Sequence, residues 1–315
     1  MCCLFGLIDT AQYFTRQQKN AILHALASAS EARGQDATGV AYCHKGALMV
    51  RKRPVPGHAF PLQIPYNAVV VMGHTRLTTQ GSEKKNYNNH PFLAPAGAGS
   101  FALAHNGVIR NDRLLRTQEQ LPATKIETDS YIAVQLLTRS GEVSMDSLRD
   151  MAERLEGSFS FTVLDDQNNL YFVKGDSPLC LYHYPEAGVY LYASTKPVLE
   201  QALQQFPFAL DHPIQIPLNC GEILQITAEG EERRDTFDDS KLLRGLAYGR
   251  CTPPTWWGIG GSVHNAESGH LAALKSVAGY FGIAPWEIDR LMEAGFTEAE
   301  IEEYLYSIKF RQFGQ

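Results

Sequence analysis

The chain has 315 residues, 44% of them apolar and 20% charged, which is the composition of an ordinary globular protein. Its formal net charge of −6 argues against a nucleic-acid partner, because phosphate binding requires clustered Lys and Arg. No apolar run approaches the roughly 18 residues that span a bilayer, and the N-terminus lacks the features of a signal peptide. We therefore expect a cytoplasmic protein without a membrane partner, built as one large domain or one domain with a small module.

The six cysteines have neither the Cys-x-x-Cys spacing of zinc sites nor the density of a disulfide framework. They are Cys2, Cys3, Cys43, Cys180, Cys220 and Cys251. This distribution predicts reduced thiols, and we expect no metal and no cofactor. The opening Met-Cys-Cys has two interpretations. Cys2 is either an ordinary buried cysteine or, once Met1 is removed, a residue that carries both a thiol nucleophile and a free α-amine as its base.

The hydrophobic pattern predicts strands in groups and helices in pairs. A helix is expected over 15–34, with a capping box at Thr15 and Gln18, and further helices over 127–140, 144–157 (with Ser144 as N-cap) and about 197–204. Besides the apolar run 4–8, strands are expected at 38–43, 47–52, 67–73, 99–107, 158–165, 169–175, 188–194 and 221–228. This order favours an α+β fold of layered sheets with helices outside over a doubly wound parallel sheet.

The character of the sequence changes at about residue 240. We expect a main domain over 2–240, a Pro/Gly/Trp-rich connector over 241–263 and a small helical module over 264–315. Pro285 suits the first turn of a helix that Gly295 ends, and Thr297 with Glu300 forms a second capping box. Acidic residues dominate this module, which argues against a DNA-binding helix pair. The module is expected either to dock a partner protein or to pack on its own domain.

Polar, glycine-marked stretches follow the predicted strands, where active sites collect. Arg76 is either a surface or ion-paired arginine or a fork for a substrate carboxylate. Asp129 either caps a helix or receives a substrate ammonium group. A guanidinium and a carboxylate together suit an α-amino acid, because both of its backbone charges require partners.

Asn106 and Gly107 form either a tight turn or a pair of hydrogen-bond donors, side-chain amide and backbone N–H, that stabilise an oxyanion. His74, His90 and His105 lack the spacing of a zinc motif, so we expect them to pack or to form hydrogen bonds. Each feature alone is a weak signal. Together they indicate an N-terminal thiol, an oxyanion hole and an amino-acid clamp in one chain.

This set resembles the class II glutamine amidotransferases, the N-terminal-nucleophile hydrolases found in glucosamine-phosphate synthase, asparagine synthetase and phosphoribosylpyrophosphate amidotransferase. The resemblance covers about residues 2–227, in the family's order. The matching segments are Cys2, Arg33 to Gly39, His74-Thr75-Arg76, Asn88-Asn89-His90-Pro91, His105-Asn106-Gly107 and Glu127-Thr128-Asp129. Two positions depart from the pattern: Cys3 replaces a glycine, and Gln80 stands where some members have histidine.

The resemblance implies a four-layer αββα sandwich and assigns roles to individual residues. Cys2 would be the nucleophile, and Asn106 with Gly107 would form the oxyanion hole. Arg76 would hold the α-carboxylate of glutamine, and Asp129 its α-ammonium group. Residues lining the pocket or supporting the site would be Thr79, His90, Arg33 and His74.

The implied reaction is attack of the Cys2 thiolate on the side-chain carbonyl of glutamine, which releases ammonia and leaves a γ-glutamyl thioester for water to cleave. A free α-amine, with an ordinary pKa of about 7.7–8.0, would accept the thiol proton near neutral pH. The roughly 75 residues after position 240 contain no phosphate-binding loop. We therefore expect a separate ammonia-accepting synthetase subunit as partner. The alternatives are a hydrolase of another γ-glutamyl amide and a non-catalytic binding or regulatory protein.

Overall fold

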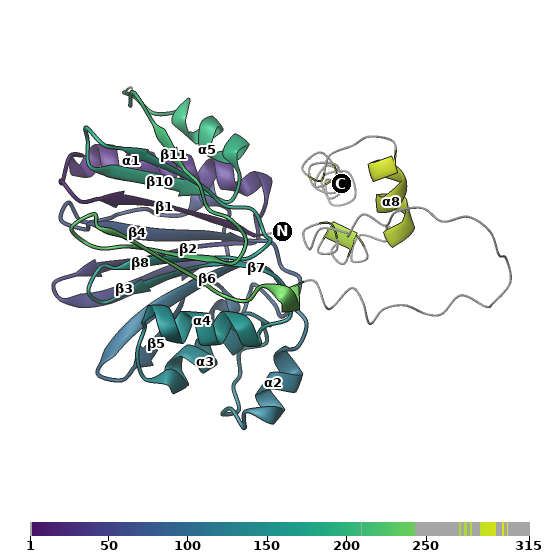
Figure 1. The fold of residues 1–315 in the computed structure, drawn as a ribbon. Helices are drawn as coiled ribbons and strands as arrows, with labels where there is room; N and C mark the ends of the chain where they lie inside the picture. Colours follow the sequence, from purple (N-terminus) through teal and green to yellow (C-terminus); the bar gives the residue numbers. More distant parts are fainter. Residues whose placement is uncertain are drawn as a thin grey trace, which may run out of the picture.

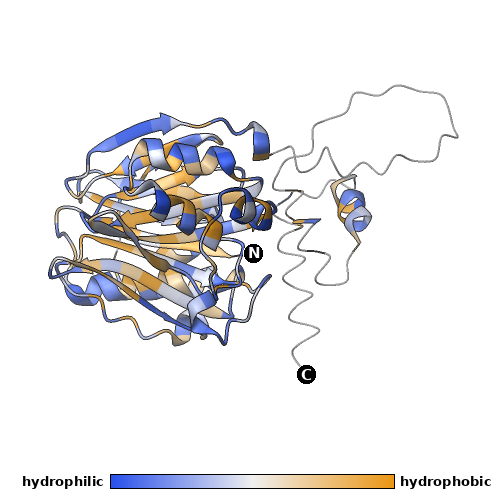
Figure 2. Ribbon diagram, turned by 90° about the horizontal axis from the view of Figure 1, so that it is seen from below, coloured by the Kyte–Doolittle hydropathy of each residue, from blue (hydrophilic) through white to orange (hydrophobic). Residues whose placement is uncertain are grey.

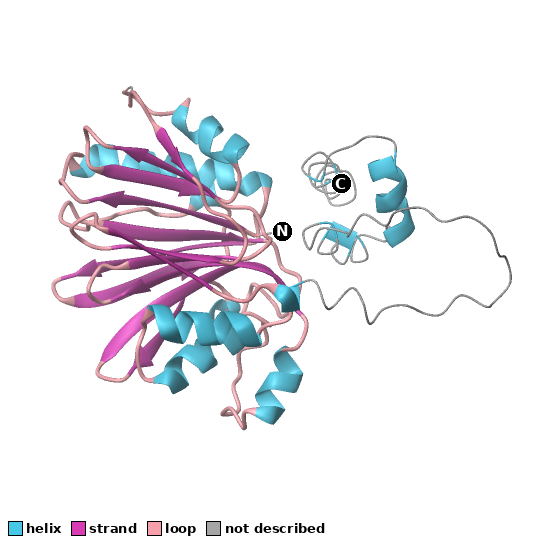
Figure 3. Ribbon diagram, viewed as in Figure 1, coloured by secondary structure: helices cyan, strands magenta, loops and turns pink. Residues whose placement is uncertain are grey.

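The computed structural model describes residues 2–208, 210–242 and 284–293, together with the single positions 271, 274, 275, 278, 298 and 301. Within these residues, two antiparallel sheets face each other and helices lie along their outer sides (Figures 1 and 3). The expected α+β class is confirmed. In the described part of the chain, no helix is both long enough and apolar enough to cross a membrane.

Each sheet is ordered by antiparallel pairing. The first has seven strands in the order β11 (Ile214–Ile216), β9 (Cys180–Tyr184), β10 (Val189–Ala193), β1 (Cys3–Asp9), β4 (Val70–Arg76), β2 (Ala37–His44) and β3 (Ala47–Arg53). The second has six in the order β13 (Glu232–Thr236), β12 (Glu222–Ile226), β8 (Leu170–Lys174), β7 (Gly157–Asp165), β6 (Gly99–Ile109) and β5 (Phe92–Ala96).

Each sheet has its own pair of packed helices. On the first sheet these are α1 (Arg16–Ala29) and α5 (Lys196–Leu203), and on the second they are α3 (Tyr131–Ser140) and α4 (Met145–Arg154). The short α2 (Asp112–Gln118) follows β6, and α8 (Pro285–Glu293) lies in the C-terminal segment. Apolar residues concentrate on the strands and on the inner sides of the helices (Figure 2).

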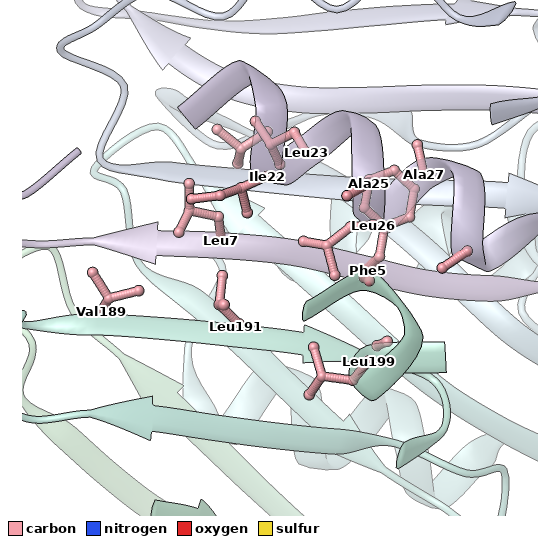
Figure 4. Packing of buried hydrophobic residues seen from close by; sticks show 14 of the residues in the cluster. Phe5, Leu7, Ile22, Leu23, Ala25, Leu26, Ala27, Val189, Leu191 and Leu199 are labelled. Carbon is pink, nitrogen blue, oxygen red and sulfur yellow. The ribbon is translucent and has the colours of Figure 1, made fainter. Parts of the chain in front are cut away.

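The alternation of side chains along β1 explains why the core has several parts. Phe5 and Leu7 point toward α1 and α5, where they join Leu26 and neighbouring apolar residues (Figure 4). Leu4 and Ile8 belong instead to the cluster between the two sheets. Because both faces of β1 are buried, its sequence is a continuous apolar run. Burying each such side chain contributes about 1.5–3 kcal/mol.

Local signals at the helix ends are confirmed. The Thr15 hydroxyl accepts from the backbone N–H of Gln18 at 3.2 Å, and the Gln18 side chain accepts from the N–H of Thr15 at 3.0 Å. Ser144 caps α4 in the same reciprocal way. Helix α8 begins at Pro285, as expected. The predicted features at Gly295, Thr297 and Glu300, and positions 243–263 of the predicted connector, lie outside the described residues.

Two sequence interpretations are wrong in a way that matters for the site. Asn106 and Gly107 do not form a tight turn, because β6 continues through them to Ile109 and pairs Asn106 with Ser160 of β7. The helix expected over 127–140 begins only at Tyr131. Residues 127–130 therefore form the approach to α3 rather than its first turn.

Candidate active site

The start of β1 lies beside the end of β4, because the two strands are antiparallel and Cys3 pairs with Thr75. Cys2 is partly buried there, and its thiol lies 3.6 Å from the Leu77 carbonyl oxygen, which accepts from it. Cys3, the departure from the family pattern, is fully buried in the core that faces α1. The Cys3 side chain thus lies in the core, while the Cys2 thiol lies at the end of the sheet, beside Leu77.

Arg33 joins the two sheets at this end. Its Nε donates to the Cys2 carbonyl oxygen at 3.1 Å, and its Nη2 donates to Asn106 Oδ1 at 3.5 Å. This contact fixes which end of the Asn106 amide faces Arg33. Asn106 is fully buried, and its Nδ2 has no hydrogen-bond partner among the described residues. The Asn106 amide therefore keeps a free N–H donor beside Arg33, which also binds the Cys2 backbone.

Gly107 follows with a φ of +140°, which side-chain-bearing residues rarely adopt. A Cβ atom at this position would overlap the carbonyl oxygen of Ser158 on β7. The positive φ and the close approach of Ser158 both require glycine at position 107. The two donors predicted from the sequence, Asn106 and Gly107, therefore lie within β6.

Arg76 ends β4 and is only 2% exposed, so the surface interpretation is wrong. Its Nη1 donates to Asn89 Oδ1 at 2.7 Å, and its Nη2 donates to the Gln80 carbonyl oxygen at 2.6 Å. The sequence motif contains Asn89, but its role as the partner of Arg76 was not predicted. The guanidinium is held in one orientation by neutral acceptors, which leaves its positive charge for another group.

Asp129 does not cap α3. Its Oδ2 accepts from the backbone N–H of Ile109 at 2.7 Å, and its Oδ1 accepts from the Ser130 hydroxyl at 3.3 Å. Burial raises the pKa of Asp129, while these two hydrogen bonds and the positive charge of Arg76 act in the opposite direction. The contact with Ile109 ties the carboxylate to the strand that carries Asn106.

The Cys2 thiol lies in the electrostatic field of both charged groups. Burial raises the pKa of the Cys2 thiol, Arg76 lowers it and Asp129 raises it again. Cys2, Arg76 and Asp129 are therefore close enough to influence one another. A thiol in this environment needs a base to become a thiolate near neutral pH.

Two histidines, His74 and His105, lie in this network as neutral rings. His74 donates from Nε2 to the His105 carbonyl oxygen at 3.0 Å and so links the two sheets. His105 Nδ1 lies 2.8 Å from the Ser130 hydroxyl. Burial lowers the pKa of both His74 and His105 to about 3. Among the described residues, no three His, Cys, Asp or Glu side chains are grouped as metal ligands.

Two other predicted residues lie at the margin of this network. The His90 ring lies between His74 and Phe92, tilted against the first and edge-on to the second, with centroid distances of 4.3 Å and 4.4 Å. It is 3% exposed, and neither ring nitrogen has a partner among the described residues. Thr79 is partly exposed on the loop after β4, and among the described residues no hydrogen bond joins it to the others.

The fold and this arrangement of groups define a class of protein, the glutamine amidotransferases with an N-terminal nucleophile. A family model described as "Glutamine amidotransferase domain" matches residues 74–201. The chain carries a class II glutamine amidotransferase domain.

Among known proteins, glutamine–fructose-6-phosphate aminotransferase (isomerizing) from Geobacillus kaustophilus is 30% identical over 209 residues, which are 63% of this chain and 32% of the relative. The enzyme of that name from Listeria innocua is 30% identical over 240 residues, 74% of this chain and 38% of the relative. The chain thus spans about a third of the length of these curated relatives.

A solved structure of glutamine phosphoribosylpyrophosphate amidotransferase from B. subtilis aligns with a TM-score of 0.59 and 21% identity. The alignment covers 89% of this chain and 58% of that one. At this level of identity the comparison supports the fold.

Proposed function

We propose that the domain releases ammonia from the side chain of glutamine through a γ-glutamyl thioester on Cys2. The observation that carries this proposal is the orientation of Asn106. Its Oδ1 is occupied by Arg33, which also binds the Cys2 carbonyl oxygen, and its Nδ2 is a buried donor without a partner among the described residues. A buried, unpaired donor costs free energy unless an acceptor arrives, and a developing oxyanion is such an acceptor.

The proposed reaction begins after removal of Met1. The α-amine of Cys2 takes the thiol proton, and the thiolate attacks the side-chain carbonyl carbon of glutamine. The resulting oxyanion accepts hydrogen bonds from Asn106 Nδ2 and the Gly107 N–H. The ammonium of Cys2 then returns its proton to the leaving nitrogen, which departs as ammonia. A water molecule, deprotonated by the same amine, hydrolyses the thioester and releases glutamate.

The substrate is proposed to bind through its two backbone charges. Arg76 has five N–H donors. Two hydrogen bonds, to Asn89 and to Gln80, use some of them, and the remaining N–H groups are proposed to bind the α-carboxylate. Asp129 would receive the α-ammonium group, as its buried carboxylate lacks a cationic hydrogen-bond partner among the described residues. His90 and Thr79 are proposed to line the pocket. Arg33 and His74 support it through the contacts described above.

The wider context of the reaction is also a proposal. The relatives are named as aminotransferases for fructose-6-phosphate and are about three times as long as the matched region. We propose that a separate synthetase subunit accepts the ammonia. A reducing compartment such as the cytoplasm suits a mechanism that needs a free Cys2 thiol. The packing of helices outside each sheet supports the four-layer αββα description.

Intact mass and glutamine hydrolysis test this function together. The processed protein should lack Met1 and release ammonia, and Cys2→Ala should abolish the release. Asn106→Ala should lower kcat by about 10²–10³-fold with little change in KM, because an oxyanion donor acts only in the transition state. Asn20→Ala serves as the matched control, because the Asn20 side chain bonds the backbone of Arg16 and Ile64 and none of the site residues.

Three results would contradict the proposal in different ways. Retained Met1 in active protein would remove the proposed base. Unchanged activity in Cys2→Ala would exclude the thiol mechanism and favour a non-catalytic role for this residue. Inert glutamine alongside a cleaved γ-glutamyl anilide would assign the domain to another γ-glutamyl amide.

A further inference from the structure

Lys52 lies outside every motif of the sequence, yet it contacts the segment that carries Asn89. It lies on β3, and its Nζ donates to the backbone carbonyl oxygens of Asn89 and Pro91, the latter at 3.1 Å. The same ammonium lies 4.9 Å from the centre of the Phe92 ring. The Lys52 ammonium therefore contacts the segment that leads into β5 at two carbonyl groups and one aromatic ring.

The segment held by Lys52 is the one that orients Arg76. Asn89 Oδ1 accepts from Arg76 at 2.7 Å, while Asn89 Nδ2 donates to the Glu83 carbonyl oxygen at 2.8 Å and to Asn86 Oδ1 at 3.1 Å. Asn86 in turn donates from its Nδ2 to the Lys52 carbonyl oxygen at 2.9 Å. Lys52 thus contacts this segment with both its side chain and its backbone.

Gly39 on β2 allows this close approach. A Cβ atom at Gly39 would overlap the His90 carbonyl oxygen and would come within 2.8 Å of Lys52 Cβ and 2.9 Å of Pro91 Cδ. The segment 88–91 therefore lies directly on the β2–β3 hairpin. This packing brings the Lys52 ammonium to the two carbonyl groups that it binds.

We propose that Lys52 is a positioning residue for substrate binding: it holds Asn89 so that Asn89 aims the Arg76 guanidinium at the α-carboxylate of the substrate. The inference rests on the proposed function of this site. Lys52 acts through Asn89 and does not itself touch the substrate. Its removal should therefore weaken substrate binding more than it slows the chemical step.

The charge of Lys52 gives this role a pH dependence. Burial, and then the positive charge of Arg76, lower the pKa of Lys52 to about 8. The other titratable groups that face it, His74 and His90, have a pKa lowered by burial and are neutral near pH 7. The ammonium is present below its pKa and is lost above it. KM for glutamine should therefore rise as the pH increases through about 8.

Glutamine hydrolysis by processed protein, measured from about pH 7 to about pH 9.5, tests this role. Lys52→Met should raise KM by about tenfold or more at pH 7 and change kcat by less than about threefold, since hydrogen bonds to charged groups are worth about 1.5–3 kcal/mol. Lys52→Arg should keep the KM at pH 7 and show a smaller alkaline rise, because arginine stays charged. Only the part of the rise that comes from loss of the substrate's own α-ammonium proton should remain. The control is Lys84→Met, because Lys84 is an exposed lysine in the segment between β4 and β5.

Ligand-free crystal structures separate failure of this inference from failure of the proposed function. In Lys52→Met, Asn89 should no longer lie within hydrogen-bond distance of Arg76. A retained Arg76–Asn89 contact overturns the inference whether or not glutamine is the substrate, as does an unchanged KM in Lys52→Met. An alkaline rise in KM that has the same size and midpoint in Lys52→Arg as in the unsubstituted protein also overturns it, and this readout remains if Lys52→Met does not fold.

Discussion

Asp129 shows how one residue in this site combines two opposed requirements. In the proposed function its carboxylate must be ionised to attract the α-ammonium group of the substrate, yet burial raises its pKa. The N–H of Ile109 and the hydroxyl of Ser130 compensate in part, because both donate to the carboxylate. The Ser130 hydroxyl is in turn placed by His105. The charge on Asp129 is thus maintained by a short chain of hydrogen bonds that the bound substrate would complete.

We predict that KM for glutamine rises at acid pH because Asp129 becomes protonated. We call this rise the acid limb. Asp129 is ionised above its raised pKa, so attraction for the α-ammonium group is lost as the pH falls through that value. The rise in KM should begin above the ordinary aspartate pKa of about 3.9. Asp129→Asn should raise KM at neutral pH by about tenfold or more and remove the limb. Ammonia release measured from about pH 4.5 to 7 provides the test.

A matched control for this titration is Asp165→Asn, because burial also raises the pKa of Asp165. Asp165 lies at the β7–β8 turn, where it accepts from Gln167 and Asn169. Its substitution should leave the acid limb intact. An acid limb that survives in Asp129→Asn would assign the titration to another group.

Among the helices and strands, features set by neighbouring residues were predicted better than features set by strand pairing. The capping box at Thr15 and the N-cap at Ser144 were found because each depends on only a few neighbouring residues. The strands missed were β5, β9, β11 and β13. Of these, β11 and β13 are short and mostly exposed, so they lack the apolar pattern on which a prediction depends. Pairing with β7 overrides the turn preference of Asn106 and Gly107.

The same distinction separates the site residues that were predicted from those that were missed. Arg76, Asn106 and Asp129 stand in recognisable motifs. Lys52 does not, because its role depends on a contact with Asn89 across 37 positions of sequence. Such a contact follows from the packing of the hairpin and leaves no local pattern.

We predict that Gly39→Ala both destabilises the domain and weakens substrate binding. The added Cβ would overlap the His90 carbonyl oxygen, so the 88–91 segment must shift away from β2. Overpacking of this kind costs about 1–3 kcal/mol. The shift also moves Asn89 relative to Arg76, so KM should increase. Urea unfolding and KM for glutamine measure the two effects.

The control for this substitution is Gly46→Asn in the β2–β3 turn. Gly46 has a φ of +74° and no atom within 4 Å of an added Cβ. Asparagine tolerates this conformation, so stability should change by less than about 1 kcal/mol and KM should not change. If Gly39→Ala matched the parent in both unfolding midpoint and KM, the segment would not be braced against β2.

For the whole molecule, the C-terminal segment has an apolar cluster of its own. Its described members are Leu271, Leu274, Ala278, Ile288 and Ile301, with Leu291 and Met292 at the margin. From the main domain, Val108 packs against this cluster. Val108 lies between Gly107 and Ile109, which donates to Asp129. Figure 1 shows α8 at the same end of the sheets as the N-terminus.

We predict that a chain without residues 264–315 keeps its fold and the proposed glutaminase activity. The cores of the main domain contain no described residue beyond Leu242, so truncation removes none of the core contacts seen among the described residues. It exposes Val108, which is already partly exposed, at a cost of about 1 kcal/mol. For a domain of this size that cost corresponds to about 2–4 °C in Tm. Calorimetry and ammonia release measure the outcome, with Val108→Ser in the full chain as the control for the single contact.

The two variants together distinguish the roles open to the module. If Val108→Ser reproduces the small loss of the truncated chain, the module contributes to stability through that contact alone. A truncated chain that unfolds or aggregates would show that the module belongs to the domain core. A truncated chain that stays active and still copurifies with the proposed synthetase partner from the native host would exclude docking through the module. The partner surface would then have to lie on the two-sheet domain itself.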